Sequence, residues 1–318
     1  MSQLFFERDC ASARRDRREL LGKVERLRGR QRMLDALRGW FRGEDFLEVE
    51  SPVRLGDPAL EDYIDAVEAG EGKWLRTSPE LHLKRLLAAG IPRIFEIGPC
   101  FRLGESGDHH REEFTMLEWY RVGGTWLQLM EDAQGMIRAA LSAVHPGKTT
   151  TPFRGHTIDF GGEWERLTVE DAFQKYAECS LREALDRGCF EEVLCTQVEP
   201  HLGTERPLFL TEYPLECSGL SAPLPGKPGK VARWELYIVG LEIGNACTEL
   251  ADAAEQERRF QQTAELRERE GRPVYPMDQG YMNALWEGFP LCAGTAIGLD
   301  RLAMVLTNAQ DIAEVRAF

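Results

Sequence analysis

Apolar residues in the first part of the chain recur at helical spacing. Leu20, Leu21, Val24 and Leu27 alternate with charged residues at intervals of three or four positions, which is typical of one apolar face on a helix. A short apolar segment, residues 46–50, follows and is stopped by Ser51-Pro52. We therefore predict a helix over residues 14–43 and an extended segment over residues 46–50.

A second helix is predicted to begin at Ser78-Pro79-Glu80. Ser78 has the side chain of an N-cap residue, Pro79 suits the first turn, and leucines recur behind it over residues 81–87. Two strand-like runs follow, over residues 93–101 and 114–122, with a polar loop between them. Such a long loop is uncommon without a role, so we expect an antiparallel pair with a functional loop.

The rest of the chain alternates between blocks of helix and paired strands. We predict helices over 125–144, 251–270 and 300–307, short helices within 168–200, irregular chain over 145–165, and strands at 208–213, 233–244 and 294–299. Strands in pairs and helices in blocks indicate an α+β fold with an antiparallel sheet flanked by helices.

Composition agrees with an ordinary globular chain. The chain has 318 residues, of which 43% are hydrophobic and 29% charged, and no apolar run approaches the roughly 18 residues that span a bilayer. The cysteines are scattered, without zinc-ligand spacing. We expect reduced thiols, a cytoplasmic location and no membrane partner.

The charge distribution bears on partners. A net charge of −14 argues against a general nucleic-acid binder, because such proteins cluster Lys and Arg against phosphates. The exception is a basic N-terminal extension, residues 1–19, continued by basic positions up to residue 30. It is either a solvated helix face or a docking surface for an acidic partner.

Four segments, in chain order, resemble the motifs of class II aminoacyl-tRNA synthetases, in particular their lysine branch. Residues 46–53, with Pro52, resemble motif 1, and residues 93–102 and 113–120 together resemble motif 2. Residues 241–250 resemble the lysine-branch segment that binds substrate and metal, and residues 294–301 resemble motif 3. The resemblance covers roughly residues 20–318. It implies a single catalytic domain over residues 1–318, adenylation of an amino acid by ATP, and a homodimer formed through motif 1.

The resemblance also implies an ATP site. Arginine suits this chemistry because its planar fork binds phosphate and carboxylate oxygens. Arg102 would bridge the substrate carboxylate and the α-phosphate, and Arg301 would hold the γ-phosphate. Phe114 would stack on adenine, and Glu235 and Glu242 would hold Mg²⁺. The remaining ATP-binding residues that it implies are Leu103, Gly104, His110, Arg111, Ile243 and Gly298.

The same resemblance implies an amino-acid pocket. Glu80 and Glu249 would recognise substrate ammonium groups, since a charged group in a pocket requires a paired carboxylate. Tyr120 and Asn245 would close the pocket. The implied set is completed by Ser78, Pro79, Glu118 and Ala296.

One branch of this family fits the chain more closely than the others. The motif 1 segment is reached within fifty residues, so we expect no anticodon-binding barrel. Residues 77–87 and 114–121 resemble the branch that attaches (R)-β-lysine to a lysine side chain of elongation factor P. That branch has alanine at the position of Ala296, where lysine–tRNA enzymes have glycine. The partners implied are elongation factor P and (R)-β-lysine or lysine, with tRNA unlikely.

Three positions depart from the family pattern, and they leave alternatives open. Gly104 stands where an acid is expected, with Glu105 after it; Arg111 replaces an asparagine; Cys247 replaces an aromatic residue. The alternatives are an adenylating enzyme with another acceptor, such as a free amino acid or tRNA, and an inactive regulatory paralogue. Glu80 and Glu249 disfavour an aspartate substrate, which requires a cation for its side chain.

Overall fold

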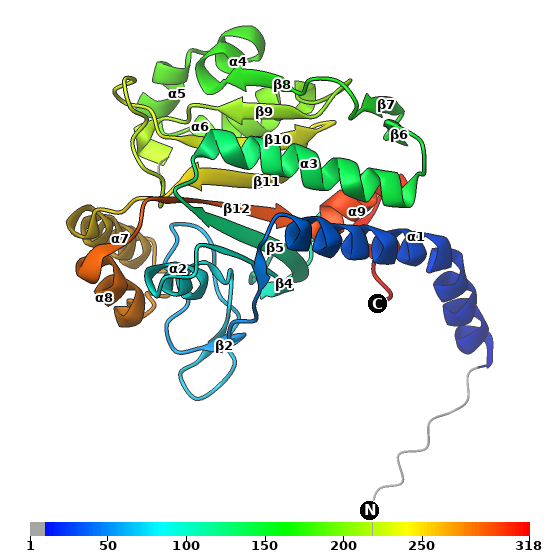
Figure 1. Cartoon of the computed structure of the whole chain (residues 1–318), viewed down its shortest axis with the longest axis horizontal. Helices are drawn as coiled ribbons and strands as arrows, with labels where there is room; N and C mark the ends of the chain where they lie inside the picture. The colour runs from blue at the N-terminus through cyan, green and yellow to red at the C-terminus, as the bar shows by residue number, and fades with distance from the viewer. Residues whose placement is uncertain (1–9, 218) are drawn as a thin grey trace, which may run out of the picture.

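The protein is built around one large sheet. The computed structural model describes residues 10–217 and 219–318, with side chains from residue 14 onward. The strand order is β1-β4-β5-β12-β11-β10-β9-β8 (Figure 1). The bounds are β1 Leu47–Glu48, β4 Arg93–Phe101, β5 Glu113–Val122, β12 Cys292–Gly298, β11 Leu241–Thr248, β10 Arg233–Ile238, β9 Leu208–Thr211 and β8 Glu165–Thr168. The α+β class predicted from the sequence is confirmed.

The sheet is mixed rather than wholly antiparallel. In the spatial order β4-β5-β12-β11-β10-β9, neighbouring strands are antiparallel. At the two edges, β1 pairs with β4 and β8 pairs with β9 in parallel. Each parallel pair at an edge is joined by a long crossover, as parallel strands require. The crossover from β1 to β4 contains α2 (Glu80–Ala88), and that from β8 to β9 contains α4 (Val169–Tyr176), α5 (Leu181–Asp186) and α6 (Phe190–Val193).

Helices α1 (Cys10–Gly43), α3 (Trp126–Val144) and α9 (Leu299–Thr307) cover one face of the sheet (Figure 1). Phe41 of α1 stacks on Phe95 of β4, with ring centroids 4.6 Å apart, and Trp119 of β5 is buried beside them. This layer is the main hydrophobic core, and it holds the sheet in place beneath the helices.

Two smaller hydrophobic clusters extend the fold. Helices α2, α7 (Ala253–Arg269) and α8 (Gln279–Gly288) bury a cluster that includes Tyr281, and α4 to α6 bury another against β9. None of the helices in the described part of the chain is long and apolar enough to cross a membrane. The cysteines among the described side chains are free thiols.

Residues 145–165, predicted to be irregular, contain a hairpin of β6 (Thr150–Phe153) and β7 (His156–Asp159). Its turn places Arg154 at φ 49° and Gly155 at φ 80°, the left-handed conformations that a two-residue hairpin turn requires. Arginine is an unusual residue for that conformation, so residue type did not indicate the turn. A second small sheet pairs β2 (Arg54–Leu55) with β3 (Trp74–Leu75).

Strand register gathers polar side chains on the face of the sheet opposite the helices α1 and α3. Directly paired residues across neighbouring strands share a face, and one such row runs through Glu118, Ala296, Asn245 and Glu235. A bulge in β11 opposes Tyr237 of β10 to Glu242 rather than to Ile243. The extra residue therefore brings Glu242 to the same face as Asn245.

Candidate active site

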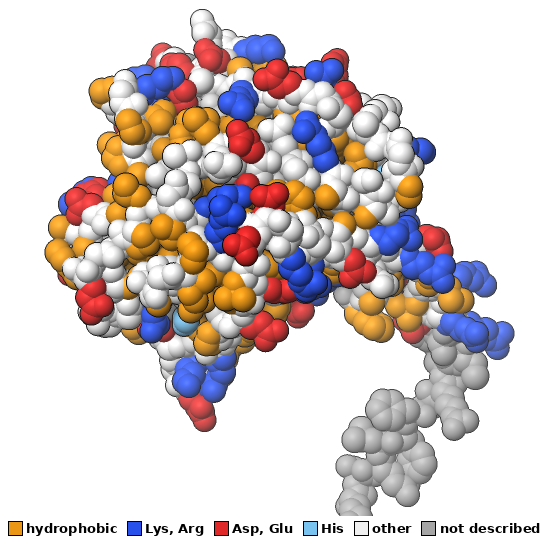
Figure 2. All heavy atoms as spheres, in the orientation of Figure 1, with side chains coloured by type: hydrophobic (Ala, Val, Ile, Leu, Met, Phe, Trp, Pro, Cys, Tyr) orange, Lys and Arg blue, Asp and Glu red, His pale blue; other side chains and the backbone are white. Residues whose placement is uncertain are grey.

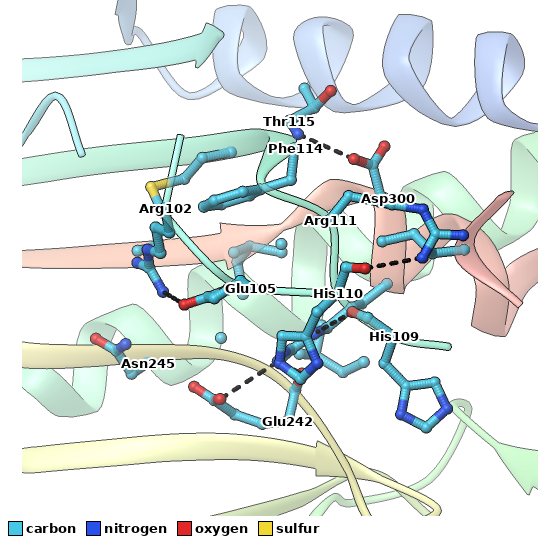
Figure 3. A pocket seen from close by; sticks show the side chains of 18 residues that line it. Arg102, Glu105, His109, His110, Arg111, Phe114, Thr115, Glu242, Asn245 and Asp300 are labelled. Atoms are coloured by element: carbon cyan, nitrogen blue, oxygen red, sulfur yellow. Dashed lines mark hydrogen bonds and ion pairs between the residues drawn. The ribbon is translucent and has the colours of Figure 1, made fainter. Parts of the chain in front are cut away.

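A cavity of about 240 Å³ lies at the ends of β4, β5, β11 and β12, and we call it the arginine cavity (Figure 3). The loop between β4 and β5 forms one wall, as its length suggested. The residues that line it are Arg102, Glu105, His109, His110, Arg111, Phe114, Thr115, Met116, Glu242, Ile243, Gly244, Asn245, Ala296, Ile297, Gly298, Asp300, Arg301 and Ile312.

Arg102 follows the end of β4 and lies over the ring of Phe114, with the guanidinium carbon 5.1 Å from the ring centroid. Its Nη1 is 3.7 Å from Oε1 of Glu105, and its buried Nε has no hydrogen-bond partner within the described residues. The guanidinium therefore keeps donors for an anion in the cavity.

Arg301 enters the cavity from the first turn of α9. Its Nη1 donates to the backbone oxygen of Glu242 at 2.8 Å and lies 3.3 Å from the Glu242 carboxylate, while Nη2 is 2.5 Å from Nε2 of His110. Burial lowers the pKa of His110, and the positive charge of Arg301 lowers it further. A neutral His110 can accept a hydrogen bond from Arg301 and so fix its position.

The loop between β4 and β5 turns at Gly104, where the family pattern has an acid. Gly104 has a φ of 79°, which glycine adopts readily, and its amide donates to the Glu112 carboxylate at 2.7 Å. The chain then turns Glu105 into the arginine cavity beside Arg102. The acid in the cavity is thus Glu105, one position after the place where the family pattern has an acid.

Arg111 lines the cavity, but its guanidinium already forms hydrogen bonds and an ion pair within the protein. Its Nη1 donates to the backbone oxygens of Gly107 and His110, and its Nη2 pairs with Asp311 at 3.2 Å. Leu103, by contrast, is 54% exposed and is not among the lining residues. Leu103 contributes its backbone, because its amide donates to the carbonyl of Asp65.

Asp300 was not predicted from the sequence as a site residue. Its buried carboxylate accepts from the amide of Thr115 at 2.9 Å and pairs with Arg30 of α1 and with Arg316. It joins the start of α9, which carries Arg301, to the strand that carries Phe114. Asp300 directly precedes Arg301 in the motif 3 segment, and this position could have indicated a role near the site.

The amino-acid side of the site is built on Glu118. Its two carboxylate oxygens accept from Ser78 Oγ at 2.6 Å and from Tyr120 Oη at 3.0 Å. Burial raises the pKa of Glu118 to about 8, and the nearby charge of Glu80 adds to this shift. Ser78 Oγ also accepts from the amide of Glu80 at 3.0 Å, so this side chain joins the start of α2 to the sheet.

The structure reveals a buried lysine between the two acids predicted to bind ammonium groups. Lys84 Nζ lies 2.6 Å from Glu80 and 2.6 Å from Glu249, and its side chain is fully buried. Burial alone would lower the pKa of Lys84, but Glu249 and Glu80 raise it well above its ordinary value. Glu249 is also buried, and it lines neither the arginine cavity nor the second cavity, which lies next to Glu80.

A second cavity, of about 250 Å³, lies beyond Asn245, which lines both cavities; we call it the distal cavity. Glu80 and Asn245, which line it, were predicted as site residues, whereas Glu61 and Gln256 were not. The residues that line it are Ala59, Leu60, Glu61, Asp62, Glu80, Leu81, Gly219, Leu220, Ser221, Arg233, Asn245, Cys247, Gln256, Arg259, Phe260 and Thr263.

The two predicted metal ligands lie in different surroundings. Glu242 lines the arginine cavity, and its side chain is 35% exposed. Glu235 is buried: one oxygen pairs with Arg233 at 2.6 Å, and the other accepts from the hydroxyls of Tyr213 and Tyr237. The described residues contain no cluster of three or more potential metal ligands. Glu242 fits a Mg²⁺ ion bound mainly by phosphates, the usual arrangement in nucleotide sites, and a metal-binding role for Glu235 stays a prediction.

Most of the predicted site residues surround the two cavities. The arginine cavity contains Arg102, His110, Arg111, Phe114, Glu242, Ile243, Asn245, Ala296, Gly298 and Arg301. Leu103 and Gly104 shape the loop above it without lining it. Pro79 is the N-cap residue of α2, and Ser78, Tyr120, Glu118 and Glu249 lie in the hydrogen-bond and ion-pair networks behind the two cavities.

Comparison with known proteins adds an independent finding. A family model described as tRNA synthetases class II (D, K and N) matches residues 18–318. The chain is 34% identical to an elongation factor P–(R)-β-lysine ligase of Salmonella gallinarum and 35% identical to one of Histophilus somni; each alignment covers 93% of this chain and 95% of the relative.

A lysine–tRNA ligase of Chloroflexus aurantiacus is 33% identical, with 96% of this chain aligned to 65% of that protein. The chain thus spans just under two thirds of the length of this relative. The family match extends over both cavities and all the segments that carry their residues. The protein belongs to the class II tRNA synthetase family (D, K and N).

Proposed function

We propose that this protein uses ATP to adenylate (R)-β-lysine or lysine and transfers the aminoacyl group to a lysine side chain of elongation factor P. The observation that carries the proposal is the arginine cavity, which joins Arg102, Phe114 and Arg301 at one site next to an acidic cavity. Relatives bearing that ligase name match over nearly their full length, which supports the choice of acceptor.

The proposed reaction has two steps. A carboxylate oxygen of the amino acid attacks the α-phosphorus of ATP, and pyrophosphate leaves. The amine of the acceptor lysine then attacks the carbonyl carbon, AMP leaves with the bonding electrons, and the amine loses a proton as the amide forms. Both steps bring anions together, so positioning and charge neutralisation are what the protein must supply.

The residues of the arginine cavity suit the first step. Arg102 has unused donors for the substrate carboxylate and the α-phosphate, and Phe114 offers a ring face for adenine. Arg301, held by Glu242 and His110, would bind the terminal phosphate. Mg²⁺ bound at Glu242 would neutralise phosphate charge.

The surroundings of the distal cavity support a cationic substrate. Glu61, Asp62 and Glu80 line it, whereas an aspartate side chain would require a free cation. Ala296 lies beside Glu118 and Asn245 in the sheet register, where a methyl group narrows the space for the substrate backbone. One methyl group is worth about 1–3 kcal/mol of discrimination, so we expect a preference for the β-amino acid rather than exclusion of lysine.

A homodimer and cytoplasmic action belong to the same proposal. Leu47 of β1, in the motif 1 segment, is 52% exposed and would lie at the surface that the proposed homodimer buries. The first turns of α1 project from the body and carry Arg15, Arg17 and Arg18 on their surface (Figure 2). We propose that this basic surface helps an acidic acceptor protein to dock.

The intact mass of purified elongation factor P tests the proposal. It is incubated with this protein, ATP and Mg²⁺, and with (R)-β-lysine, lysine or aspartate; a parallel reaction contains tRNA and lysine. We expect the mass gain of one aminoacyl group with (R)-β-lysine, a smaller yield with lysine, none with aspartate, and loss of the gain in Arg301→Ala. If tRNA were charged while the mass of elongation factor P stayed unchanged, the acceptor would be tRNA rather than elongation factor P. If no amino acid were adenylated, the proposal would be wrong.

A further inference from the structure

Arg154, at the turn of the β6–β7 hairpin, costs the fold free energy in two ways. Its φ of 49° is a left-handed conformation, which residues with a Cβ atom disfavour and glycine adopts readily. Its guanidinium is partly buried and has no ion-pair partner within the described residues. A glycine at this position would form the turn without either cost, so the turn alone does not account for the arginine.

The guanidinium of Arg154 extends from the hairpin to the loop between β4 and β5. Its Nη2 donates a hydrogen bond to Nε2 of His109. The guanidinium carbon lies 5.0 Å from the ring centroid of the fully buried Phe153, which gives the cation a fixed surface to stack on. His109 lines the arginine cavity, yet its ring points away from Arg102 and Phe114 (Figure 3). The ring of His109 is therefore a contact between the loop and the hairpin.

His109 can accept this hydrogen bond when its imidazole is neutral. Burial lowers the pKa of His109, and the positive charges of Arg154 and Arg301 lower it further, while the charge of Asp108 opposes the shift. A neutral ring that carries its proton on Nδ1 leaves Nε2 free to accept from the guanidinium. The contact is thus a hydrogen bond from a cation to a neutral acceptor.

The backbone of His109 contacts the arginine that enters the cavity from α9. The Nε of Arg301 donates to the carbonyl oxygen of His109 at 3.3 Å, and its Nη2 lies 2.5 Å from Nε2 of His110. The hairpin therefore holds the side chain of His109, and the backbone of the same residue helps to hold Arg301. The position of Arg301 depends on the position of the loop.

The loop has two further attachments outside the sheet, both to the C-terminal segment. The amide of Ile312 donates to the carbonyl of Asp108 at 2.9 Å, and Arg111 pairs with Asp311 at 3.2 Å. The side chains of that ion pair are 36% and 42% exposed, and such surface pairs contribute little on average. Arg154 adds a third attachment, between these two along the loop.

We propose that Arg154 is a positioning residue for ATP, because through His109 it holds the loop between β4 and β5, and with it Arg301, where the phosphates would bind. The inference rests on the proposed adenylation by ATP. Arg154 itself does not line the arginine cavity. Without this contact, ATP binding must also close the loop, and the cost of ordering the loop lowers the affinity.

Arg154→Gly tests the inference in the full-length protein, because glycine removes the guanidinium and suits the left-handed turn. Titration calorimetry measures the affinities for ATP with Mg²⁺ and for lysine, and hydrogen exchange of the ligand-free protein measures loop opening over residues 102–112. We expect ATP affinity to fall about five- to tenfold, lysine affinity to stay unchanged, and the loop amides to exchange faster. Lys148→Ala, which removes an exposed cation just before the same hairpin, should match the wild type.

Two further variants separate positioning from a purely structural role. Arg154→Lys should keep most of the ATP affinity, because an ammonium can also donate to His109. His109→Ala should weaken ATP binding, and Arg154→Gly should add little in that background, since the two residues form one contact. Additive losses would overturn the inference, as would equal losses for ATP and lysine, or loop exchange that is unchanged in Arg154→Gly.

Amino-acid-dependent pyrophosphate exchange is measured separately, so that the inference and the proposed function can fail independently. If ATP affinity and loop exchange depend on Arg154 but no amino acid supports pyrophosphate exchange, the positioning role stands and the proposed function is wrong. If pyrophosphate exchange is present and Arg154→Gly binds ATP as the wild type does, the proposed function stands and the positioning role is wrong. A wild type that does not bind ATP would overturn both.

Discussion

The two faces of the central sheet contrast in chemistry although the same strands form both. On one face, Phe95, Leu117 and Trp119 are fully buried beneath helices α1 and α3. On the other, Glu118, Asn245 and Glu235 stand in one row across neighbouring strands. The apolar face stabilises the fold, and the polar face holds charged groups whose burial costs free energy that a ligand can offset. Substitutions on the two faces should therefore affect different observables.

Phe95→Ala should have the largest effect, and on stability. The ring is fully buried and stacks on Phe41, so its loss should lower the free energy of unfolding by about 3–5 kcal/mol. Urea denaturation followed by circular dichroism measures this. Phe95→Leu, which keeps most of the volume, should lose less, and equal losses in the two variants would argue against a packing role.

Arg301→Ala should act on catalysis instead. Loss of its donors at the developing phosphate charge should reduce amino-acid-dependent pyrophosphate exchange by about 10²–10³-fold. Arg187→Ala is the control, because this arginine is exposed and lines neither cavity. If Arg301→Ala also lost its cooperative melting transition, its loss of activity would reflect unfolding. The two faces of the sheet would then not differ in the property that they control.

Glu118→Gln should change how stability depends on pH. The raised pKa of Glu118, about 8 against an ordinary value of 4.5, means that the folded state retains this proton where the unfolded chain releases it. This group therefore makes stability fall as pH rises from about 4.5 to 8, by at most about 1.4 kcal/mol per pH unit. Denaturation at pH 5, 6.5 and 8 should show a weaker fall in the variant, and identical profiles would contradict the assignment.

Ala296→Gly should have the smallest effect, on selectivity. Removing the methyl group between Glu118 and Asn245 should shift the ratio of kcat/KM for lysine over (R)-β-lysine toward lysine by roughly tenfold. Steady-state pyrophosphate release with each amino acid measures the ratio. An unchanged ratio would remove Ala296 from the determinants of substrate choice.

Local pattern alone predicted much of the fold. The helices around residues 14–43 and 125–144 and the strand over 93–101 agree closely with α1, α3 and β4, because period and capping are local properties of the chain. The order of the motif segments also indicated the family, which the comparisons confirm. The roles of individual site residues stay predictions, although the structure brings Arg102, Phe114 and Arg301 to one cavity.

What the sequence determined by itself was therefore the helical and strand periodicity and the family, because local pattern and motif order encode both. Only the tertiary structure decided that β1 and β8 pair in parallel at the sheet edges, and that a bulge brings Glu242 to the face of Asn245. It also decided that Lys84 lies between Glu80 and Glu249, and that Glu61 and Gln256 share a cavity. These features join residues far apart in the chain, and their positions depend on packing between elements, which no local pattern encodes.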